Sequence, residues 1–337
     1  MQANKIVLSG IRPTGDLHLG NWAGAVTKFL KLQEMDGYDR YYFIADLHAL
    51  TTLKEAVDIR AGTLHMMRQY LACGLDPNKA TIYRQSDIME IPYLATLLGM
   101  VAGYGRLQNC TTFKDKQSSQ TAKGGRITAG LFNYPVLMAA DILIVRADYV
   151  PVGEDQNQHL EMCREFASSM NSMFGTSLPE PVNFEIDGDK PVRVPGLDGS
   201  GKMGKSSGGK PINLISDPKT IRKQIMSAET DFGPVPGQPM GQAMQNLFTF
   251  MENFSSPEMV ASFKARYDNG EQKFYGEMKK QIANDVIALC EPIRDRYFND
   301  PACSEEAAIQ VLQEGAEKVR PVAKEVLADA LSKMGIS

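Results

Sequence analysis

The 337-residue sequence lacks the features that would place it outside a reducing compartment or in a membrane. Its five cysteines form no C-x-x-C pair and their number is odd, which argues against a disulfide framework and a structural zinc site. No run approaches the ~18 apolar residues of a membrane span. The N-terminal stretch MQANKIVLSG lacks the apolar core of a signal peptide. We therefore expect a cytoplasmic protein with no membrane partner.

An excess of charge of one sign is also lacking. The formal net charge is −4, so no global basic field points to nucleic acid, although a local basic patch is compatible with that total. A hydrophobic content of 43% and a charged content of 23% are ordinary for a globular protein. The length indicates about two domains.

The first 160 residues alternate between strand-like and helix-like patterns. Strands are expected at residues 5–11, 40–50, 80–86 and 148–155, and helices at 21–35, 57–75, 91–104 and 157–171. Such alternation predicts an α/β fold, a Rossmann-type parallel sheet covered on both faces. Ligands of such sheets bind where strands end and helices begin.

Residues 196–212, GLDGSGKMGKSSGGKPI, interrupt this pattern. Six glycines and three lysines in 17 residues predict a mobile loop. After about residue 215 strand signals fade, and helices are expected at 217–228, 245–254, 257–267, 273–298 and 307–334. We therefore divide the chain into an α/β domain, 1–212, which includes the loop, and a helical region, 213–337.

The stretch RPTGDLHLGN, residues 12–21, joins the first expected strand to the first expected helix. It has no G-x-G-x-x-G spacing. A helix that begins near residues 17–21 would present free backbone N–H groups and a positive dipole end, which suit an anion. Gly20 would let a flat base or a phosphate approach, and His18 and Asn21 add side-chain donors. The alternative is a plain turn with a chance histidine.

The segment GSGKMGKS, residues 199–206, formally satisfies the Walker A pattern of a P-loop. The residues that follow, SGGKP, will not start the helix which that pattern requires. The segment is better interpreted as two lysines, Lys202 and Lys205, on a flexible arm that folds over a triphosphate. A solvated loop without a role is the alternative.

Several other polar residues stand out. Glu154, Asp155 and Gln156 follow an expected strand and suit ribose hydroxyls or an ammonium group, although Asp155 could simply cap a helix. Asp141 lies in the apolar run YPVLMAADILIV, where it could accept an N–H from a ligand or point to solvent. Lys114 and Lys116 could contact phosphate or form a solvated charge run. No role is assigned to His65.

Together these motifs resemble the tyrosyl and tryptophanyl subgroup of the class I aminoacyl-tRNA synthetases. PTGDLHLGN resembles the first signature, P-x-x-x-x-H-x-G-H, with Asn21 in place of the last histidine. KMGKS, residues 202–206, resembles the second signature, K-M-S-K-S, with Gly204 in place of serine. The stretch GEDQ, where tyrosine-specific members are expected to have GSDQ, favours tryptophan as the substrate; a tyrosine enzyme is the nearest alternative.

The resemblance implies that the protein activates L-tryptophan with ATP to tryptophanyl-adenylate and transfers the acyl group to tRNA(Trp). It implies a catalytic role for His18, Asn21, Lys202 and Lys205, with Mg²⁺ bound on the phosphates and no metal held by the protein itself. The implied ATP-binding residues are Arg12, Pro13, Thr14, Gly20, Asn21, Gly153, Glu154, Asp155, Val194, Lys202, Met203, Gly204, Lys205 and Ser206.

The resemblance also implies a tryptophan pocket, in which Asp141 accepts the indole N–H. The residues implied to line it are Met138, His48, Gln156, Val150, Val152 and Leu8. Leu8 and Arg12 depart from the bacterial pattern, which often has an aromatic residue and a glutamine there. By the same resemblance, the C-terminal helices bind the tRNA anticodon and the protein is a homodimer.

Two other classes of protein remain to be separated from this one. A P-loop NTPase or kinase is disfavoured by the residues after Ser206. A binding module that keeps the fold but not the reaction is favoured only by Gly204, whereas both lysines persist.

Overall fold

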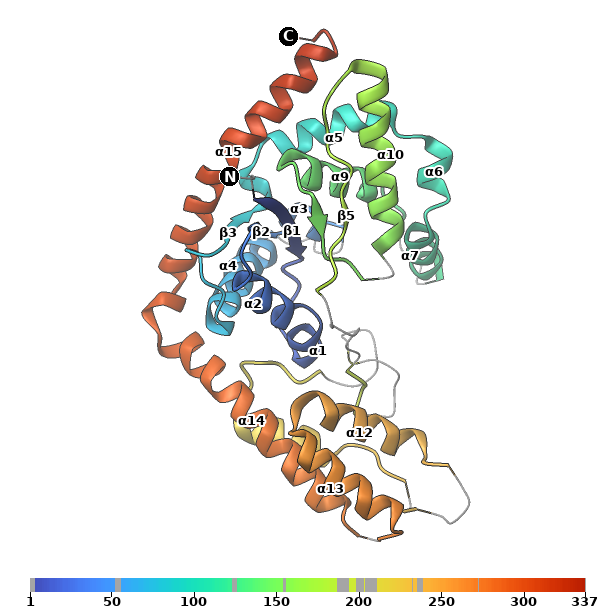
Figure 1. The fold of residues 1–337 in the computed structure, drawn as a ribbon, viewed down its shortest axis with the longest axis vertical. Helices are drawn as coiled ribbons and strands as arrows, with labels where there is room; N and C mark the ends of the chain where they lie inside the picture. Colours follow the sequence, from blue (N-terminus) through green and yellow to red (C-terminus); the bar gives the residue numbers. More distant parts are fainter. Residues whose placement is uncertain are drawn as a thin grey trace.

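The computed structural model describes residues 4–51, 56–122, 126–153, 156–186, 194–197, 203, 211–231, 233–234, 239–271 and 273–336. Its centre is a five-stranded sheet (Figure 1). The strands are β1 (Lys5–Ile11), β2 (Tyr38–Ile44), β3 (Thr81–Arg84), β4 (Tyr149–Val150) and β5 (Val182–Asn183). All four pairings are parallel, in the order β3-β2-β1-β4-β5. The chain therefore reverses its winding between β1 and β4, and the carboxyl ends of these two strands mark the ligand crevice.

Alternate residues of the strands build two apolar cores, because successive side chains of a strand point to opposite faces. Val7 and Tyr42 belong to one buried cluster, while their neighbours Leu8 and Phe43 belong to the other. The first face is covered by α1 (Leu19–Asn21), a π-helical turn η1 (Trp22–Val26), α2 (Thr27–Gln33) and α4 (Ala56–Cys73). The second is covered by α5 (Glu90–Val101), α9 (Tyr134–Ile144) and α10 (Asn157–Phe174). The predicted α/β sheet is confirmed.

The remaining helices of this part are α3 (Asp46–Ala49), η2 (Gln85–Asp87), α6 (Tyr104–Gln108), α7 (Thr111–Ala122) and α8 (Ala129–Phe132). Apart from α7, they have three to five residues each. Of these, α3 corrects a prediction, because a strand was expected over 40–50 and β2 ends at Ile44. Asp46 provides the reason: its carboxylate accepts the backbone N–H groups of Leu47 and Ser86 at 3.0 Å, which replaces strand pairing with a helical turn.

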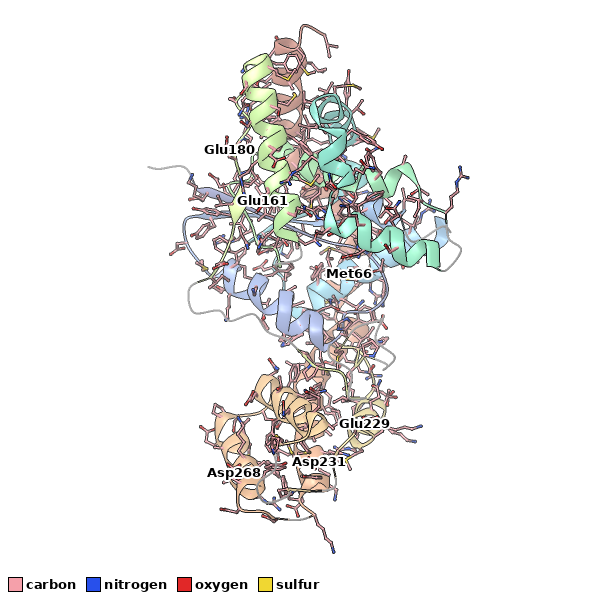
Figure 2. All side chains as sticks on the ribbon, turned by 90° about the vertical axis from the view of Figure 1, so that its right-hand side faces the viewer. Met66, Glu161, Glu180, Glu229, Asp231 and Asp268 are labelled. Atoms are coloured by element: carbon pink, nitrogen blue, oxygen red, sulfur yellow. The ribbon has the colours of Figure 1, made fainter. Side chains whose placement is uncertain are left out.

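A helical part occupies one end of the molecule. It comprises α11 (Pro218–Met226), α12 (Gln242–Phe254), α13 (Pro257–Asp268) and α14 (Tyr275–Asn299). Figure 2 shows Asp231 and Asp268 in this part and Glu161 and Glu180 in the α/β part. After η4 (Pro301–Cys303), α15 (Glu305–Lys333) runs back along the sheet (Figure 1). The division at residue 212 stays a prediction.

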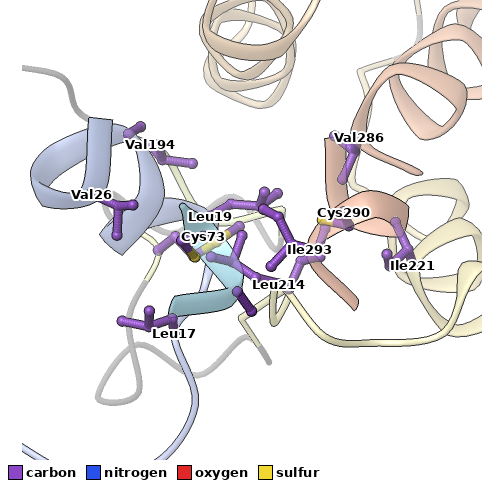
Figure 3. Close-up of a cluster of buried hydrophobic side chains, with 14 of the residues drawn as sticks. Leu17, Leu19, Val26, Cys73, Val194, Leu214, Ile221, Val286, Cys290 and Ile293 are labelled. Carbon is purple, nitrogen blue, oxygen red and sulfur yellow. The ribbon is translucent and has the colours of Figure 1, made fainter. Parts of the chain in front are cut away.

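The first core continues from the α/β part into the helical part. Figure 3 shows Leu19 and Leu214 beside Ile293 of α14, with Cys73 of α4 close by. The turn that follows β1 is thus packed against the long helix that joins the two parts. Among the helices that the structure describes, none combines the length and the apolarity needed to span a membrane.

Candidate active site

The turn after β1 closes on itself around His18. Gly15 has φ +73°, a conformation that favours glycine, and the chain then enters α1. The His18 N–H donates to Asn21 Oδ1 at 3.0 Å, and the Gly20 N–H donates to His18 Nδ1 at 3.1 Å. Because Nδ1 accepts this hydrogen bond, a neutral His18 carries its own proton on Nε2. Two of the predicted catalytic residues therefore hold each other in place.

This geometry corrects one expectation. The N–H groups at the start of the helix were expected to be free for an anion, but they already have partners. Leu19 N donates to Ile212 O at 3.0 Å, Gly20 N to the His18 ring, and Asn21 N to His18 O at 2.8 Å. The reasons are the capping box between His18 and Asn21 and the pairing of this turn with residues 212–214, which supplies the partner of the Leu19 N–H. An anion at this turn is therefore met by side chains, not by these N–H groups.

Helix α4 supports the turn with one of its faces, through residues three and four positions apart. A Cβ at Gly62 would lie 2.7 Å from the Pro13 carbonyl oxygen, so the close approach requires glycine. The His65 Nε2 lies 2.5 Å from Asp16 Oδ1. One turn further, the Leu17 N–H donates to the buried Gln69 side chain at 2.9 Å. The position of His18 thus depends on α4.

The chain on both sides of the lysine-rich segment also contacts this turn. Residues 212–214 pair with 17–19 through Leu19 N to Ile212 O and Leu214 N to Leu17 O, at 3.0 and 2.9 Å. Met203, which stands between the two lysines, is buried and donates its N–H to Val194 O at 2.8 Å. A Cβ on Gly20 would lie 3.6 Å from Met203 O. The structure therefore brings Met203, Val194 and Gly20 together, and all three are among the residues predicted for ATP.

Six of the predicted ATP-site or catalytic residues lie outside the described residues, namely Glu154, Asp155, Lys202, Gly204, Lys205 and Ser206. Gly153, which directly precedes Glu154 and lies three residues after β4, accepts the Gln156 N–H at its carbonyl at 2.9 Å. Arg12, Pro13 and Thr14 form the first part of the turn after β1, and the Thr14 N–H donates to Arg12 O at 2.8 Å. The described part of the predicted ATP site therefore lies at the ends of β1 and β4.

A second polar centre surrounds Asp141, whose side chain is only 1% exposed. One carboxylate oxygen, Oδ2, lies 2.8 Å from His48 Nε2, and the other, Oδ1, accepts Gln85 Nε2 at 2.7 Å. The alternative in which Asp141 points to solvent is therefore wrong, because the Asp141 side chain points from α9 toward the second buried cluster. Each oxygen retains a lone pair, so the carboxylate can accept a further hydrogen bond.

The electrostatics of this centre are those of a charge removed from water. Burial raises the pKa of Asp141, while the hydrogen bonds from His48 and Gln85 oppose that rise. His48 Nδ1 is buried, and none of the residues that the structure describes forms a hydrogen bond with it. A buried nitrogen without a hydrogen-bond partner costs free energy.

Aromatic side chains connect Asp141 with the predicted amide of the pocket, Gln156. The ring of Tyr134 lies 4.3 Å from that of His48 and 5.6 Å from that of His159. His159 Nδ1 lies 2.7 Å from Gln156 Oε1. A small cavity opens beside this row, lined by Tyr134, His159 and Lys116 among others, and Lys116 Nζ lies 4.9 Å above the Tyr134 ring. The ammonium group of Lys116 thus lies over an aromatic ring at the edge of this cavity.

The apolar residues predicted for the tryptophan pocket belong to the same core as Asp141. Leu8 and Val150 are buried in it, and Met138 and Val152 pack against it. Met138 precedes Asp141 by three positions on α9, so both share one helix face. The structure thus gathers an apolar lining, a buried carboxylate and two imidazoles at the carboxyl ends of the strands.

Sequence reasoning missed several residues of this arrangement. Gln85 is fully buried, and its Oε1 also accepts the Leu47 N–H at 3.1 Å. Its signal was available: it follows β3 directly, at the same edge of the sheet as Asp46. Asn183 also escaped notice; its Oδ1 accepts the Val152 N–H at 3.1 Å and so braces the end of β4. Asp16 and His65 could not be found from spacing, because only the fold brings them together.

Comparison with known proteins agrees with this geometry. The family model described as "tRNA synthetases class I (W and Y)" matches residues 2–291. The tryptophan–tRNA ligase of Porphyromonas gingivalis is 46% identical over 332 residues, which cover 98% of each chain. That of Caldanaerobacter subterraneus subsp. tengcongensis is 38% identical over 345 residues, again 98% of each chain.

A solved structure gives the same result in three dimensions. The tryptophanyl-tRNA synthetase of Campylobacter jejuni, described as complexed with ADP and tryptophan, superimposes with a TM-score of 0.84 at 33% identity. The match covers 98% of this chain and 99% of that one.

Proposed function

The chain belongs to the class I tRNA synthetases of the tryptophan and tyrosine family and is a tryptophan–tRNA ligase, and we propose how its two polar centres divide the reaction. The Asp141 centre binds tryptophan, and the His18 turn, with the lysine-rich segment, binds ATP. The residues of the Asp141 centre follow β2 and β3 or lie on α9, and the His18 turn follows β1, so both centres lie at the carboxyl edge of the sheet. The carboxylate of bound tryptophan then attacks the α-phosphorus of ATP, and pyrophosphate leaves.

The observation that carries the proposal is the buried Asp141 carboxylate, held by His48 and Gln85 in an otherwise apolar core. Its role is to accept the indole N–H. An acceptor placed to receive an N–H discriminates strongly against an amino acid without one, because it is then left unpaired in a dry site. Leu8, Met138, Val150 and Val152 enclose the ring, while Gln156 meets the polar end of the amino acid.

The ATP subsite is assigned to the turn and the segments that contact it. His18 donates from Nε2 while the Gly20 N–H keeps its ring oriented, and Asn21, which accepts the His18 backbone N–H, turns its amide nitrogen toward the nucleotide. Gly20, which has no side chain, leaves room for the nucleotide between His18 and Met203, and Val194 contacts the base. Lys202 and Lys205 neutralise the charge that develops on the departing pyrophosphate. ATP enters as its Mg²⁺ complex, since that ion is usually held through substrate phosphates.

The remaining predicted residues complete the nucleotide subsite. Arg12, Pro13 and Thr14 frame one side of ATP. Gly153, Glu154 and Asp155 take the adenosine side, and Gly204 and Ser206 belong to the lysine-bearing segment over the phosphates.

The experiment is tryptophan-dependent exchange of pyrophosphate into ATP, with tyrosine measured in parallel. Exchange with tryptophan and at most traces with tyrosine are expected. Equal exchange with both amino acids would overturn the assignment of Asp141 as the indole acceptor. A synthetase-like binding module would give exchange with neither.

The partner of the helical region is proposed to be the anticodon of tRNA(Trp). Helix α11 presents the exposed cations Lys219, Arg222 and Lys223, which suit a phosphate backbone. Charge reversal of Lys219 and Lys223 should raise KM for tRNA in aminoacylation and leave pyrophosphate exchange unchanged. Equal KM values in variant and wild type would remove α11 from the interface.

Since tRNA charging serves translation and all five cysteines are free thiols, we place the protein in the cytoplasm.

The proposed homodimer is assigned to the outer face of α5. Met89, Tyr93 and Met100 are spaced four and seven residues apart on that face, and the two methionines are 74% and 72% exposed. Apolar side chains gathered in this way mark an interaction surface, and a two-fold dimer would place the same face against itself. Met100→Glu should shift sedimentation from dimer to monomer, whereas Ile309→Glu, at an exposed position of α15, should not. A wild-type monomer would refute the dimer.

A further inference from the structure

A chain of side-chain hydrogen bonds runs from the long helix α14 to the turn that carries His18. The Tyr297 hydroxyl, near the end of α14, lies 2.7 Å from His65 Nδ1 on α4. His65 Nε2 lies 2.5 Å from Asp16 Oδ1 in the turn, and Asp16 Oδ2 accepts Asn213 Nδ2 at 2.7 Å. Four segments, namely α14, α4, the turn after β1 and residues 212–214, are thereby joined through the side chains of His65 and Asp16.

Between Tyr297 and Asp16 the donors of this hydrogen-bond chain point the same way, toward the Asp16 carboxylate, which also accepts from Asn213. Arg68 Nη1 donates to the Tyr297 oxygen at 3.2 Å, so the hydroxyl proton is available for His65 Nδ1. A neutral His65 then carries its proton on Nε2 and donates to Asp16. Burial raises the pKa of the Tyr297 hydroxyl, which keeps it a donor at neutral pH. Each group therefore has a partner of the right kind, and the chain specifies one arrangement.

The end at α14 is fixed firmly. Arg68 also donates from Nη2 to Tyr297 O at 3.0 Å and from Nε to Cys303 O at 2.7 Å, and its guanidinium lies 4.3 Å from the centre of the Tyr297 ring. The Tyr297 side of the chain is thus held by α4 at the junction of α14 and η4. The end at the turn is more open, since the Asp16 and His65 side chains are 33% and 30% exposed.

The Asp16 end of this chain of hydrogen bonds contacts two segments of the polypeptide. Asp16 stands two positions before His18, and Asn213 stands three positions after the last residue of the segment 204–210. Residues 17–19 and 212–214 are already paired by backbone hydrogen bonds. The Asp16–Asn213 hydrogen bond adds a side-chain contact to that backbone pairing. It fixes the position of the residues after the lysine-bearing segment relative to the His18 ring.

We propose that Asp16 and His65 are positioning residues for adenylate formation. They connect the His18 turn, and residues 212–214 that follow the lysine-bearing segment, to Tyr297 near the end of α14. The helical part, which is assigned to tRNA, reaches the ATP subsite through Tyr297 and His65. The inference rests on the proposed role of the His18 turn in ATP binding. It predicts that this chain of hydrogen bonds affects the rate of tryptophan activation and the KM for ATP, and not the binding of tryptophan.

The test is a double-mutant cycle with Tyr297→Phe and Asp16→Asn. The first removes only the hydroxyl; the second keeps the shape, but an amide cannot accept from His65 and from Asn213 with both of its atoms. Each single variant should lower kcat of tryptophan-dependent pyrophosphate exchange by roughly 2- to 30-fold, with KM for tryptophan unchanged. Because both act on one chain, the double variant should be hardly slower than the slower single variant.

The matched control is Tyr275→Phe. Tyr275 lies on the same helix, and its hydroxyl donates to the Asp231 carboxylate at 2.7 Å, but neither residue contacts the turn. This variant should exchange at the wild-type rate. A purely structural role of the chain would lower the midpoint of unfolding in all variants and leave kcat at saturating substrates unaltered.

His18→Ala separates the two proposals. Slow exchange in His18→Ala with wild-type kcat in Tyr297→Phe would overturn the positioning chain and leave the ATP site standing. Multiplicative losses in the double variant would also overturn it, because independent sites add in free energy. Normal exchange in His18→Ala would overturn the proposed ATP site itself.

Discussion

His48 and Asp141 form a buried pair, with 2.8 Å between Nε2 and Oδ2, although His48 lies on α3 and Asp141 lies on α9. Their side chains are 4% and 1% exposed. The attraction between two such groups is strong because little water screens it. Burial of the carboxylate nevertheless costs free energy unless its lone pairs accept hydrogen bonds. Three donors, namely His48, Gln85 and the indole N–H of the substrate, would satisfy it. This relationship makes the selectivity of the site testable.

Asp141→Asn keeps the shape of the side chain and removes its charge. A hydrogen bond to a charged group is worth about 1.5–3 kcal/mol, so tryptophan activation should fall by roughly 10- to 150-fold in kcat/KM. Activation of phenylalanine, which has no N–H to donate, should change little, and the ratio of the two should narrow. Exchange kinetics with both amino acids provide the measurement. Asp329→Asn, at the surface of α15, is the control, and an unaltered ratio in Asp141→Asn would reject the assignment.

Gln85→Met should shift the pH dependence of tryptophan use. The Gln85 hydrogen bond lowers the pKa of Asp141 against the rise caused by burial, so its loss raises that pKa further. A carboxyl with a higher pKa is protonated at higher pH and accepts the indole N–H less well. The acid limb of the pH profile of kcat/KM for tryptophan should therefore move to higher pH.

The control for this shift is Gln310→Met. The Gln310 amide likewise donates to a carboxylate, that of Glu314 at 2.8 Å, but at the surface of α15. Its profile should coincide with that of the wild type. A limb that stays in place or moves to lower pH in Gln85→Met would show that Asp141 is not the group that titrates.

The two polar centres differ in how far the sequence predicts them. Strand–helix alternation predicts the sheet, and the position of His18 after β1 follows from it, because ligands bind at the carboxyl ends of parallel strands. Asp141 stands out as one carboxylate in an apolar run. Its partners do not, since Gln85 and His48 reach it only through tertiary packing. The turn of α3 was hidden because the hydrophobic run of β2 continues past Ile44, while the Asp46 side chain ends the strand.

Gly20→Ala should disturb the His18 ring directly. A Cβ at this position would lie 3.0 Å from the imidazole Nδ1 and Cε1 atoms, so the ring must move off the Gly20 N–H. Loss of a hydrogen bond of about 1 kcal/mol corresponds to roughly a 5-fold lower rate of adenylate formation, and displacement of Nε2 adds to that. Gly24→Ala, one turn further, meets nothing within 4 Å and is the matched control. Equal rates of pyrophosphate exchange in the two variants would contradict the role of His18.

Lys202→Ala and Lys205→Ala should each slow adenylate formation while leaving tryptophan binding nearly intact. Contacts that form mainly in the transition state affect the rate and not the binding of the ground state. Loss of one charge-stabilising donor typically costs ~10²–10³ in rate. Rapid-quench measurement of adenylate formation is the assay, and Lys210→Ala, from the same stretch of sequence, is the control. If both variants react at the wild-type rate, neither lysine acts on the phosphates.

Gly315→Ala should lower the stability of the whole fold, because α15 packs directly on β3. A Cβ at Gly315 would lie 1.8 Å from the carbonyl oxygen of Ile82, and a strand carbonyl cannot turn aside as a flexible side chain can. The helix would have to withdraw from the sheet, which typically costs about 1–3 kcal/mol. Elsewhere in a helix the same substitution stabilises by about 0.5–1 kcal/mol. Gly276→Ala in α14, where nothing lies within 4 Å of the added atom, should show that gain. Denaturant unfolding of both variants is the measurement, and a midpoint for Gly315→Ala at or above that of Gly276→Ala would contradict the close contact between α15 and β3.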